Sequence, residues 1–231
     1  MIFIISLIFL GIFILFVDKV VLVLIQARYL STNNNIVNQM SNFAFHTNTK
    51  KVKIYTSSKF SNNIYFTKTV FGNSVIIIGD KLLKELSVNE IKVLIYASLI
   101  CVKNKNFFLL NLMVFWGAIL YPIFYLKEFI KSEKINFLLS YILFPFYIFR
   151  KISSNENKMH ELDREIILLE GLKNEYLTAI FKISKLKIKN EMTFSGFVLN
   201  DLVLVSNISE NVILNFFNRK ISIESRVKQL L

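Results

Sequence analysis

Few side chains of this chain have the chemistry of a catalytic or metal site, and they lie in two short stretches. Ser98 and Cys101 lie inside one apolar stretch, and Met159, His160 and Asp163 lie in M-H-E-L-D. Cys101, Met159 and His160 form a soft ligand set that would suit copper(I). Cys101 with His160, or Ser98 with a lysine, would need hydrogen-bond reach to act as nucleophile and base. The sequence does not fix that geometry, and the simpler interpretation is that Cys101 and Met159 fill space as apolar groups.

The first of these stretches is predicted to be a buried helix over residues 87–106. Ser87 and Glu90 form an S-x-x-E capping box, in which each side chain accepts a hydrogen bond from a backbone N–H at the helix start. Apolar residues then run almost without a break from Ile91 to Val102. This pattern predicts burial on nearly every side of the helix. Ala97, Ser98 and Cys101 therefore belong to its enclosed centre.

Three short strands are expected before that helix, separated by polar turns. The strand sequences are V-K-I-Y-T, N-I-Y-F-T and V-I-I-I, at 52–56, 63–67 and 75–78. A short helix follows at K-L-L-K-E-L, and residues 36–44 and 153–187 carry apolar residues at helical spacing. A further helix pair is expected toward Leu231. The fold class is therefore α+β, mostly helical with a small β-sheet, plus membrane-spanning helices.

Three apolar segments indicate a membrane location. Residues 1–17 carry no charge, and after Asp18-Lys19 the apolar run resumes to Ile25. Because the segment neither opens with basic residues nor ends in a small-residue cleavage site, we interpret 1–25 as an uncleaved transmembrane anchor rather than a signal peptide. Residues 107–126 carry no charge over a length of about 30 Å, which is enough to span the hydrocarbon core.

The third segment, 135–149, is shorter and contains Pro145. It is expected to be a thin or tilted return span, or half of a re-entrant hairpin. The alternative for 107–126 and 135–149 together is a buried core hairpin of a protein domain. Placing 26–106 and 150–231, which hold most of the Lys and Arg, in the cytoplasm satisfies the positive-inside tendency of an inner membrane protein.

The net charge of +12 does not indicate a nucleic-acid partner. Nucleic-acid-binding motifs and a Gly-rich phosphate loop are missing from the sequence, so no nucleic acid is expected as a partner. The basic residues beside the apolar segments are better explained by the headgroups of an anionic leaflet; they are Lys103, Lys105, Arg150 and Lys151. The single cysteine, Cys101, excludes an intrachain disulfide. His46, in a polar stretch, is most simply a surface residue.

The order of these parts resembles the HtpX-type membrane zinc metallopeptidases, which are related to the CAAX prenyl proteases. V-K-I-Y-T and N-I-Y-F-T look like the first strands of that family, and V-I-I-I-G-D-K-L-L-K-E-L is similar to its passage into the active-site helix. Residues 90–106 match that helix and its exit, including Val102-Lys103-Asn104. M-H-E-L-D falls where the family has E-x-x-x-D. The stretch 222–227 resembles the family's last motif, with Lys220-Ile221 in place of His-Pro.

The resemblance assigns family roles to positions that here lack the chemistry for them. The two His ligands of the family's H-E-x-x-H motif fall on Ala97 and Cys101, the catalytic Glu falls on Ser98, and the third ligand falls on Met159. Asp163 falls on the Asp that in the family supports a metal ligand. Hydrolysis by zinc needs three protein ligands, a metal-bound water and a carboxylate base. Without an imidazole at position 97, Asp163 is expected to make a helix–helix hydrogen bond or an ion pair.

The resemblance therefore implies a membrane-embedded pseudopeptidase that binds or scaffolds membrane proteins or a protease complex. Its parts would be an anchor at 1–25, a peptidase-like domain split between 26–106 and 150–231, and a membrane hairpin at 107–149. No cofactor is expected, although the family uses zinc. The alternative is an active membrane metalloendopeptidase with a non-standard metal or nucleophile site. A third possibility is an unrelated membrane protein whose likeness to the family is chance.

Overall fold

A computed structural model describes ten parts of the chain. They are residues 2–30, 51–69, 72–104, 106–130, 132–153, 163–166, 168, 172–186, 198–199 and 202–204. The expected helix at 36–44, His46, Met159, His160 and the stretch at 222–227 lie outside them. Within the described residues the fold is mixed α and β, mostly helical, with one small sheet.

The sheet has four strands in the order β1-β2-β4-β3. The strands are β1 Arg28–Tyr29, β2 Val52–Ser57, β3 Ile64–Lys68 and β4 Ser74–Gly79. β4 pairs parallel with β2 and antiparallel with β3, and β1 adds an antiparallel pair at the β2 edge. The three predicted strands are confirmed to within one residue at each end. β1 was not predicted, because two residues leave no pattern of alternation to detect.

Gly79, at the end of β4, allows the sheet to close against the turn before β3. A side chain at this position would collide with the backbone of Phe60 and Ser61, whose carbonyl groups face it. The Gly79 N–H in turn donates to the Asn63 carbonyl at 2.9 Å. The V-I-I-I-G run therefore combines a buried β-branched strand with the one residue type that fits this close backbone approach.

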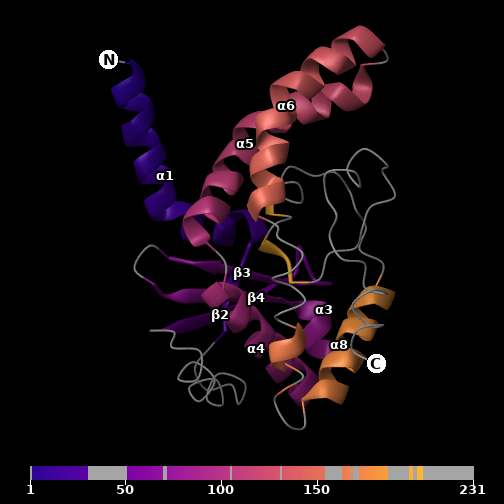
Figure 1. Cartoon of the computed structure of the whole chain (residues 1–231). Coiled ribbons are helices and arrows are strands. Elements are labelled where there is room, and N and C mark those ends of the chain that lie inside the picture. The colour runs from indigo at the N-terminus through magenta and orange to yellow at the C-terminus, as the bar shows by residue number, and fades with distance from the viewer. Residues whose placement is uncertain are drawn as a thin grey trace.

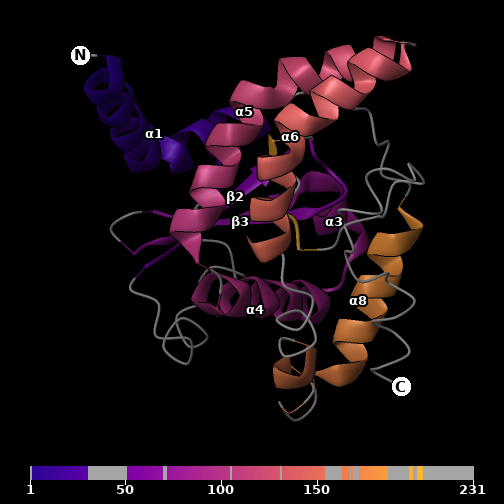
Figure 2. The same ribbon diagram turned by 45° about the horizontal axis from the view of Figure 1, so that its top comes forward.

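One face of the sheet is covered by helices α4, Val88–Asn104, and α8, Lys173–Lys185, with the short helix α3, Asp80–Glu85, beside them. Ile64, Phe66, Ile76 and Ile78 of the sheet share one buried cluster with most of α4. Figure 2 shows α4 crossing below the strands with α8 packed alongside. The predicted helices at 81–86 and 87–106 are confirmed, and α8 confirms part of the helical prediction for 153–187.

The other face of the sheet is covered by the end of helix α1, Ile2–Ile25, and the start of helix α5, Phe107–Phe129. Val17, Val21 and Ile25 are at most 1% exposed there, packed in one cluster with Tyr65 and Ile77. The apolar run after Asp18-Lys19 therefore belongs to the folded domain. The segment predicted as an anchor, 1–25, thus combines a projecting part and a packed part.

Helices α5 and α6, Glu133–Ser153, form an antiparallel hairpin that projects from the sheet domain together with α1 (Figure 1). α6 is one continuous helix with Pro145 inside it, and whether it returns across a membrane or re-enters from one side stays a prediction. Among the residues searched, one helical stretch is long and apolar enough to cross a membrane, Phe107–Leu126, and 44% of its membrane-spanning window is buried inside the protein. The expected multi-pass location is therefore not supported beyond this helix, because the uncharged part of α6 has only 15 residues.

Candidate functional site

The start of α4 is fixed by the predicted capping box. The Ser87 N–H donates to Glu90 Oε2 at 2.7 Å, and the Glu90 N–H donates to Ser87 Oγ at 3.2 Å. Both bonds satisfy N–H groups that the first turn of a helix leaves without partners. The sequence therefore determines where this helix begins, and with it the position of Ala97, Ser98 and Cys101 two to three turns later.

Glu90 also joins α4 to α8 through Lys182. The Lys182 Nζ lies 2.8 Å from both carboxylate oxygens of Glu90, and the Glu90 side chain is 7% exposed. Burial raises the pKa of this carboxyl, but hydrogen bonds from Lys182, the Ser87 backbone and Thr178 more than compensate, so its pKa is lowered overall. This pair was not found from the sequence, because its members are 92 residues apart and neither position has a distinctive local pattern.

The centre of α4 is fully enclosed. Ala97 and Ser98 are 0% exposed, and Cys101 is 2% exposed and is not in a disulfide. The Ser98 hydroxyl donates to the Leu94 carbonyl one turn earlier, at 2.8 Å. A serine that bonds its own helix in this way has its hydrogen committed within the helix. These side chains occupy the space between α4 and its neighbours rather than the wall of an open cleft.

Asp163 lies in the same part of the core. Residues 163–166 are helical, and Ile166 and Tyr176 share the buried cluster of Ala97 and Cys101. Asp163 is 2% exposed and accepts a hydrogen bond from the Tyr176 hydroxyl of α8 at 2.8 Å. The hydrogen bond expected between helices is therefore confirmed. Tyr176 itself was missed, although it is the one tyrosine among the apolar positions of α8.

The 163–166 segment also relates to the middle of α4 through Ile166, which shares the buried cluster of Tyr96 and Ala97. Burial raises the pKa of the Tyr96 hydroxyl, and the negative charge of Glu165 raises it further. Both observations are consistent with the 163–166 segment lying beside the centre of α4. The two stretches that carry the chemically competent residues are thus brought together, although Met159 and His160 are not described.

The described part of this region has few groups that could hold a metal. Ala97 has no donor atom and the Ser98 hydroxyl bonds the helix, which leaves the Cys101 sulfur and the Asp163 carboxylate. Among the described residues, no group of three or more His, Cys, Asp or Glu side chains is placed to bind one ion. Zinc in a peptidase takes three protein ligands and keeps one open position. The described residues therefore do not fit a zinc site of that kind.

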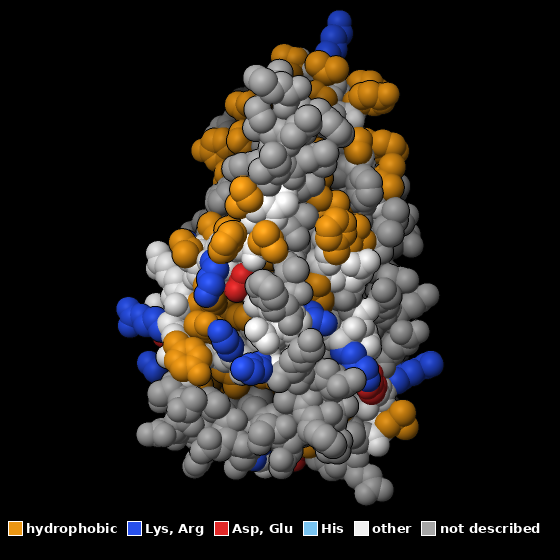
Figure 3. Space-filling model, turned by 90° about the vertical axis from the view of Figure 1, so that its left-hand side faces the viewer, with side chains coloured by type: hydrophobic (Ala, Val, Ile, Leu, Met, Phe, Trp, Pro, Cys, Tyr) orange, Lys and Arg blue, Asp and Glu red, His pale blue; other side chains and the backbone are white. Residues whose placement is uncertain are grey.

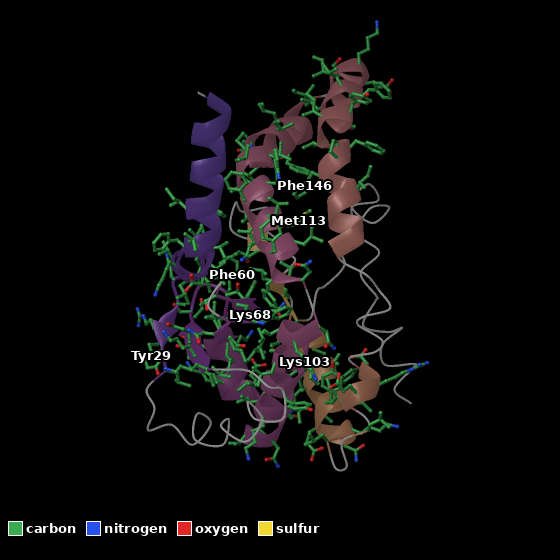
Figure 4. The ribbon with its side chains drawn as sticks, turned by 60° about the vertical axis from the view of Figure 1, so that its left-hand side comes forward. Tyr29, Phe60, Lys68, Lys103, Met113 and Phe146 are labelled. Carbon is green, nitrogen blue, oxygen red and sulfur yellow. The ribbon has the colours of Figure 1, made fainter. Side chains whose placement is uncertain are left out.

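The basic residues expected near a membrane surface are described only in part. Lys103 is exposed at the end of α4, and the side chains of Lys105, Arg150 and Lys151 are not described. The Nζ atom of Lys68, the last residue of β3, lies 6.0 Å from the ring centre of Phe107, where α5 begins. Figure 4 shows Lys68 and Lys103 near the base of the hairpin, below Met113 and Phe146.

No protein-family model, no curated protein and no solved structure matches this chain. The resemblance to the HtpX-type peptidases thus remains a prediction from the order and spacing of short motifs.

Proposed function

We propose that this chain is an HtpX-like membrane pseudopeptidase that acts by binding or scaffolding membrane proteins. The observation that carries the proposal is the enclosure of Ala97, Ser98 and Cys101 at 0–2% exposure. In the HtpX-type peptidases, these positions bear two zinc ligands and the catalytic base. Here their side chains are packed in the protein core. A serine without a neighbouring base has no useful pKa for moving a proton, and a buried thiol does not reach a peptide bond.

The membrane part of the proposal is supported by the projecting helices. Exposed apolar side chains cover the outer surface of the hairpin, among them Trp116, Ile119, Phe137, Leu138 and Tyr141. Figure 3 shows such side chains on the projecting half, whereas Lys and Arg gather lower on the sheet domain. An apolar surface of this extent on a soluble monomer would promote aggregation, whereas lipid covers it without cost.

The same contrast supports a location for the binding surface of the proposed scaffold. Since the centre of α4 is closed, a partner protein would not be held in a peptidase cleft at Ala97. Large exposed apolar side chains lie instead on the projecting helices, on α5 and α6 and also on α1 at Phe16 and Val23. We therefore expect contacts with transmembrane helices of a partner, inside the bilayer.

The decisive experiment measures metal content and cleavage on the same preparation. The full chain, purified in mild detergent, is analysed by metal mass spectrometry and incubated with casein and with a membrane peptide, beside an active zinc endopeptidase as positive control. We expect substoichiometric metal and no cleavage. Stoichiometric zinc together with peptide-bond cleavage would overturn the proposal.

The alternative hypothesis, an active membrane endopeptidase with a non-standard site, is tested with two variants. If cleavage is found, Ser98→Ala and Cys101→Ala must abolish it when those residues serve as nucleophile or ligand. Activity that survives both changes would exclude this version of an enzyme. No contact described above favours the active endopeptidase over the pseudopeptidase.

A further inference from the structure

The hairpin is a paired unit along its length, so α5 and α6 must share one environment. Met113, Phe124, Leu143 and Phe146 form a buried cluster between the two helices, and the rings of Phe124 and Phe146 are 5.7 Å apart. Two polar side chains of α6 donate to backbone acceptors: the Asn136 amide to the Ile130 carbonyl and the Ser140 hydroxyl to the Asn136 carbonyl, each at 2.7 Å.

The apolar length of this unit is limited at both ends. At the tip, Glu133 and Lys134 are exposed, and at the base the basic sequence resumes at Arg150. The 15 residues between them, 135–149, are about 22 Å long as a helix. On α5, Leu110 and Val114 lie in the buried cluster that the end of α1 shares with the sheet, and the part of the predicted span after them, 115–126, is only about 18 Å long.

Prolines shorten the reach of the hairpin further. Pro122 lies inside α5 and Pro145 inside α6, and proline removes a helix hydrogen bond and bends the axis. Figure 1 shows the outer half of the hairpin leaning away from α1 instead of continuing the direction of its base. Because of these bends, each helix reaches a shorter distance from the sheet domain than a straight helix of the same number of residues would.

We infer that the α5–α6 hairpin is built for a thin hydrocarbon layer of about 22 Å, against about 30 Å in a typical bilayer. The inference rests on the proposed membrane location. In a thick bilayer the charged tip would lie within the hydrocarbon, and each buried charge costs far more than an ångström of mismatch. Lipid thinning around the hairpin, or partition into thin bilayers, is therefore the favourable outcome. The lipids that match the length of the hairpin are therefore those with short acyl chains.

The test follows the position of the tip in bilayers of increasing thickness. The full chain with Ser132→Cys, next to the exposed tip, is reconstituted into phosphatidylcholine vesicles whose monounsaturated chains run from about 14 to about 22 carbons. A membrane-impermeant maleimide is applied from the side opposite the folded domain. The unsubstituted chain, whose Cys101 is 2% exposed, gives the background.

We expect strong labelling in the thinnest bilayers and a decrease of about tenfold in the thickest. Equal labelling at every chain length, or labelling only from the side of the domain, would overturn the inference while leaving the membrane location intact. A protein that remains outside every vesicle, as judged by flotation, would overturn the proposed membrane location itself. The two failures are thus distinguishable.

A second variant tests whether the charges at the tip cause the dependence of labelling on lipid chain length. Glu133→Leu with Lys134→Leu extends the apolar run of α6 by two residues, or about 3 Å, so the decrease in labelling should move to longer lipid chains. The matched control is Lys81→Leu with Glu85→Leu, which removes an exposed Lys–Glu pair from α3 in the sheet domain. The control must leave the chain-length dependence unchanged. A shift of equal size in both variants would contradict a role for the tip charges.

Discussion

Helices α4 and α6 have almost the same average apolarity but opposite surroundings. Of the thirteen α4 residues from Glu90 to Val102, all but Lys92 are buried. In α6 the side chains of Phe137 and Tyr141 are 77% and 73% exposed. Overall hydrophobicity thus does not distinguish a helix enclosed by protein from one that projects. The ends differ: α4 starts with a capping box tied to α8, whereas α6 lies between charged and basic stretches.

The largest expected difference between these helices is in how much unfolding free energy is lost when a leucine is replaced by alanine. Leu94→Ala in α4 should lower the free energy of unfolding by about 2–5 kcal/mol, because Leu94 is 0% exposed and a cavity remains. Leu138→Ala in α6, where the leucine is 60% exposed, should cost less than about 1 kcal/mol. Denaturant unfolding in mild detergent measures both. Equal costs would show that α6 is packed against protein.

The next prediction concerns the buried hydrogen bond beside the centre of α4. Tyr176→Phe removes the donor to the Asp163 carboxylate, which is 2% exposed, and should cost about 1–3 kcal/mol of unfolding free energy. Asp163→Asn and the double variant complete a mutant cycle. A coupling energy near zero between the two positions would contradict a stabilising role for this bond.

A smaller effect is expected for the charge that joins α4 and α8. Because the pKa of Glu90 is lower in the folded protein than in the unfolded chain, its contribution is fully present above the unfolded pKa and is lost as pH falls through the folded pKa. Glu90→Gln keeps a capping-box residue but removes the charge, so it should cost about 1 kcal/mol at neutral pH and less below about pH 4. Unfolding curves against pH measure it. The same cost at every pH would refute the assignment.

The smallest effect is expected at the family's base position. Ser98→Ala removes a hydroxyl that bonds its own helix, and alanine is the better helix former, so unfolding free energy should change by less than about 0.5 kcal/mol. Cys101→Ala, which leaves a small cavity, is the informative neighbour and should cost about 1 kcal/mol. A large loss on Ser98→Ala would indicate an additional role for the hydroxyl.

Local sequence signals predicted the elements that position the candidate site. The Ser87–Glu90 box, the three strands and the short helix before α4 depend on neighbouring residues, and all of them are confirmed. The strand β1, the choice of Tyr176 as the partner of Asp163, and the Glu90–Lys182 pair were not predicted. Each joins residues of different elements, 13 residues apart for Asp163 and Tyr176 and 92 for Glu90 and Lys182, and a single sequence carries no signal of which partner is chosen.

Residue types alone determined that position 97 has no donor atom and that the start of α4 is capped, since both are properties of a few adjacent residues. The tertiary structure decided which apolar stretches face inward. It closed the centre of α4 with strands and with α8, packed the end of α1 on the sheet, and left the hairpin exposed. Burial is a property of what surrounds a helix, and the surroundings are set by contacts between segments that the chain brings together only on folding.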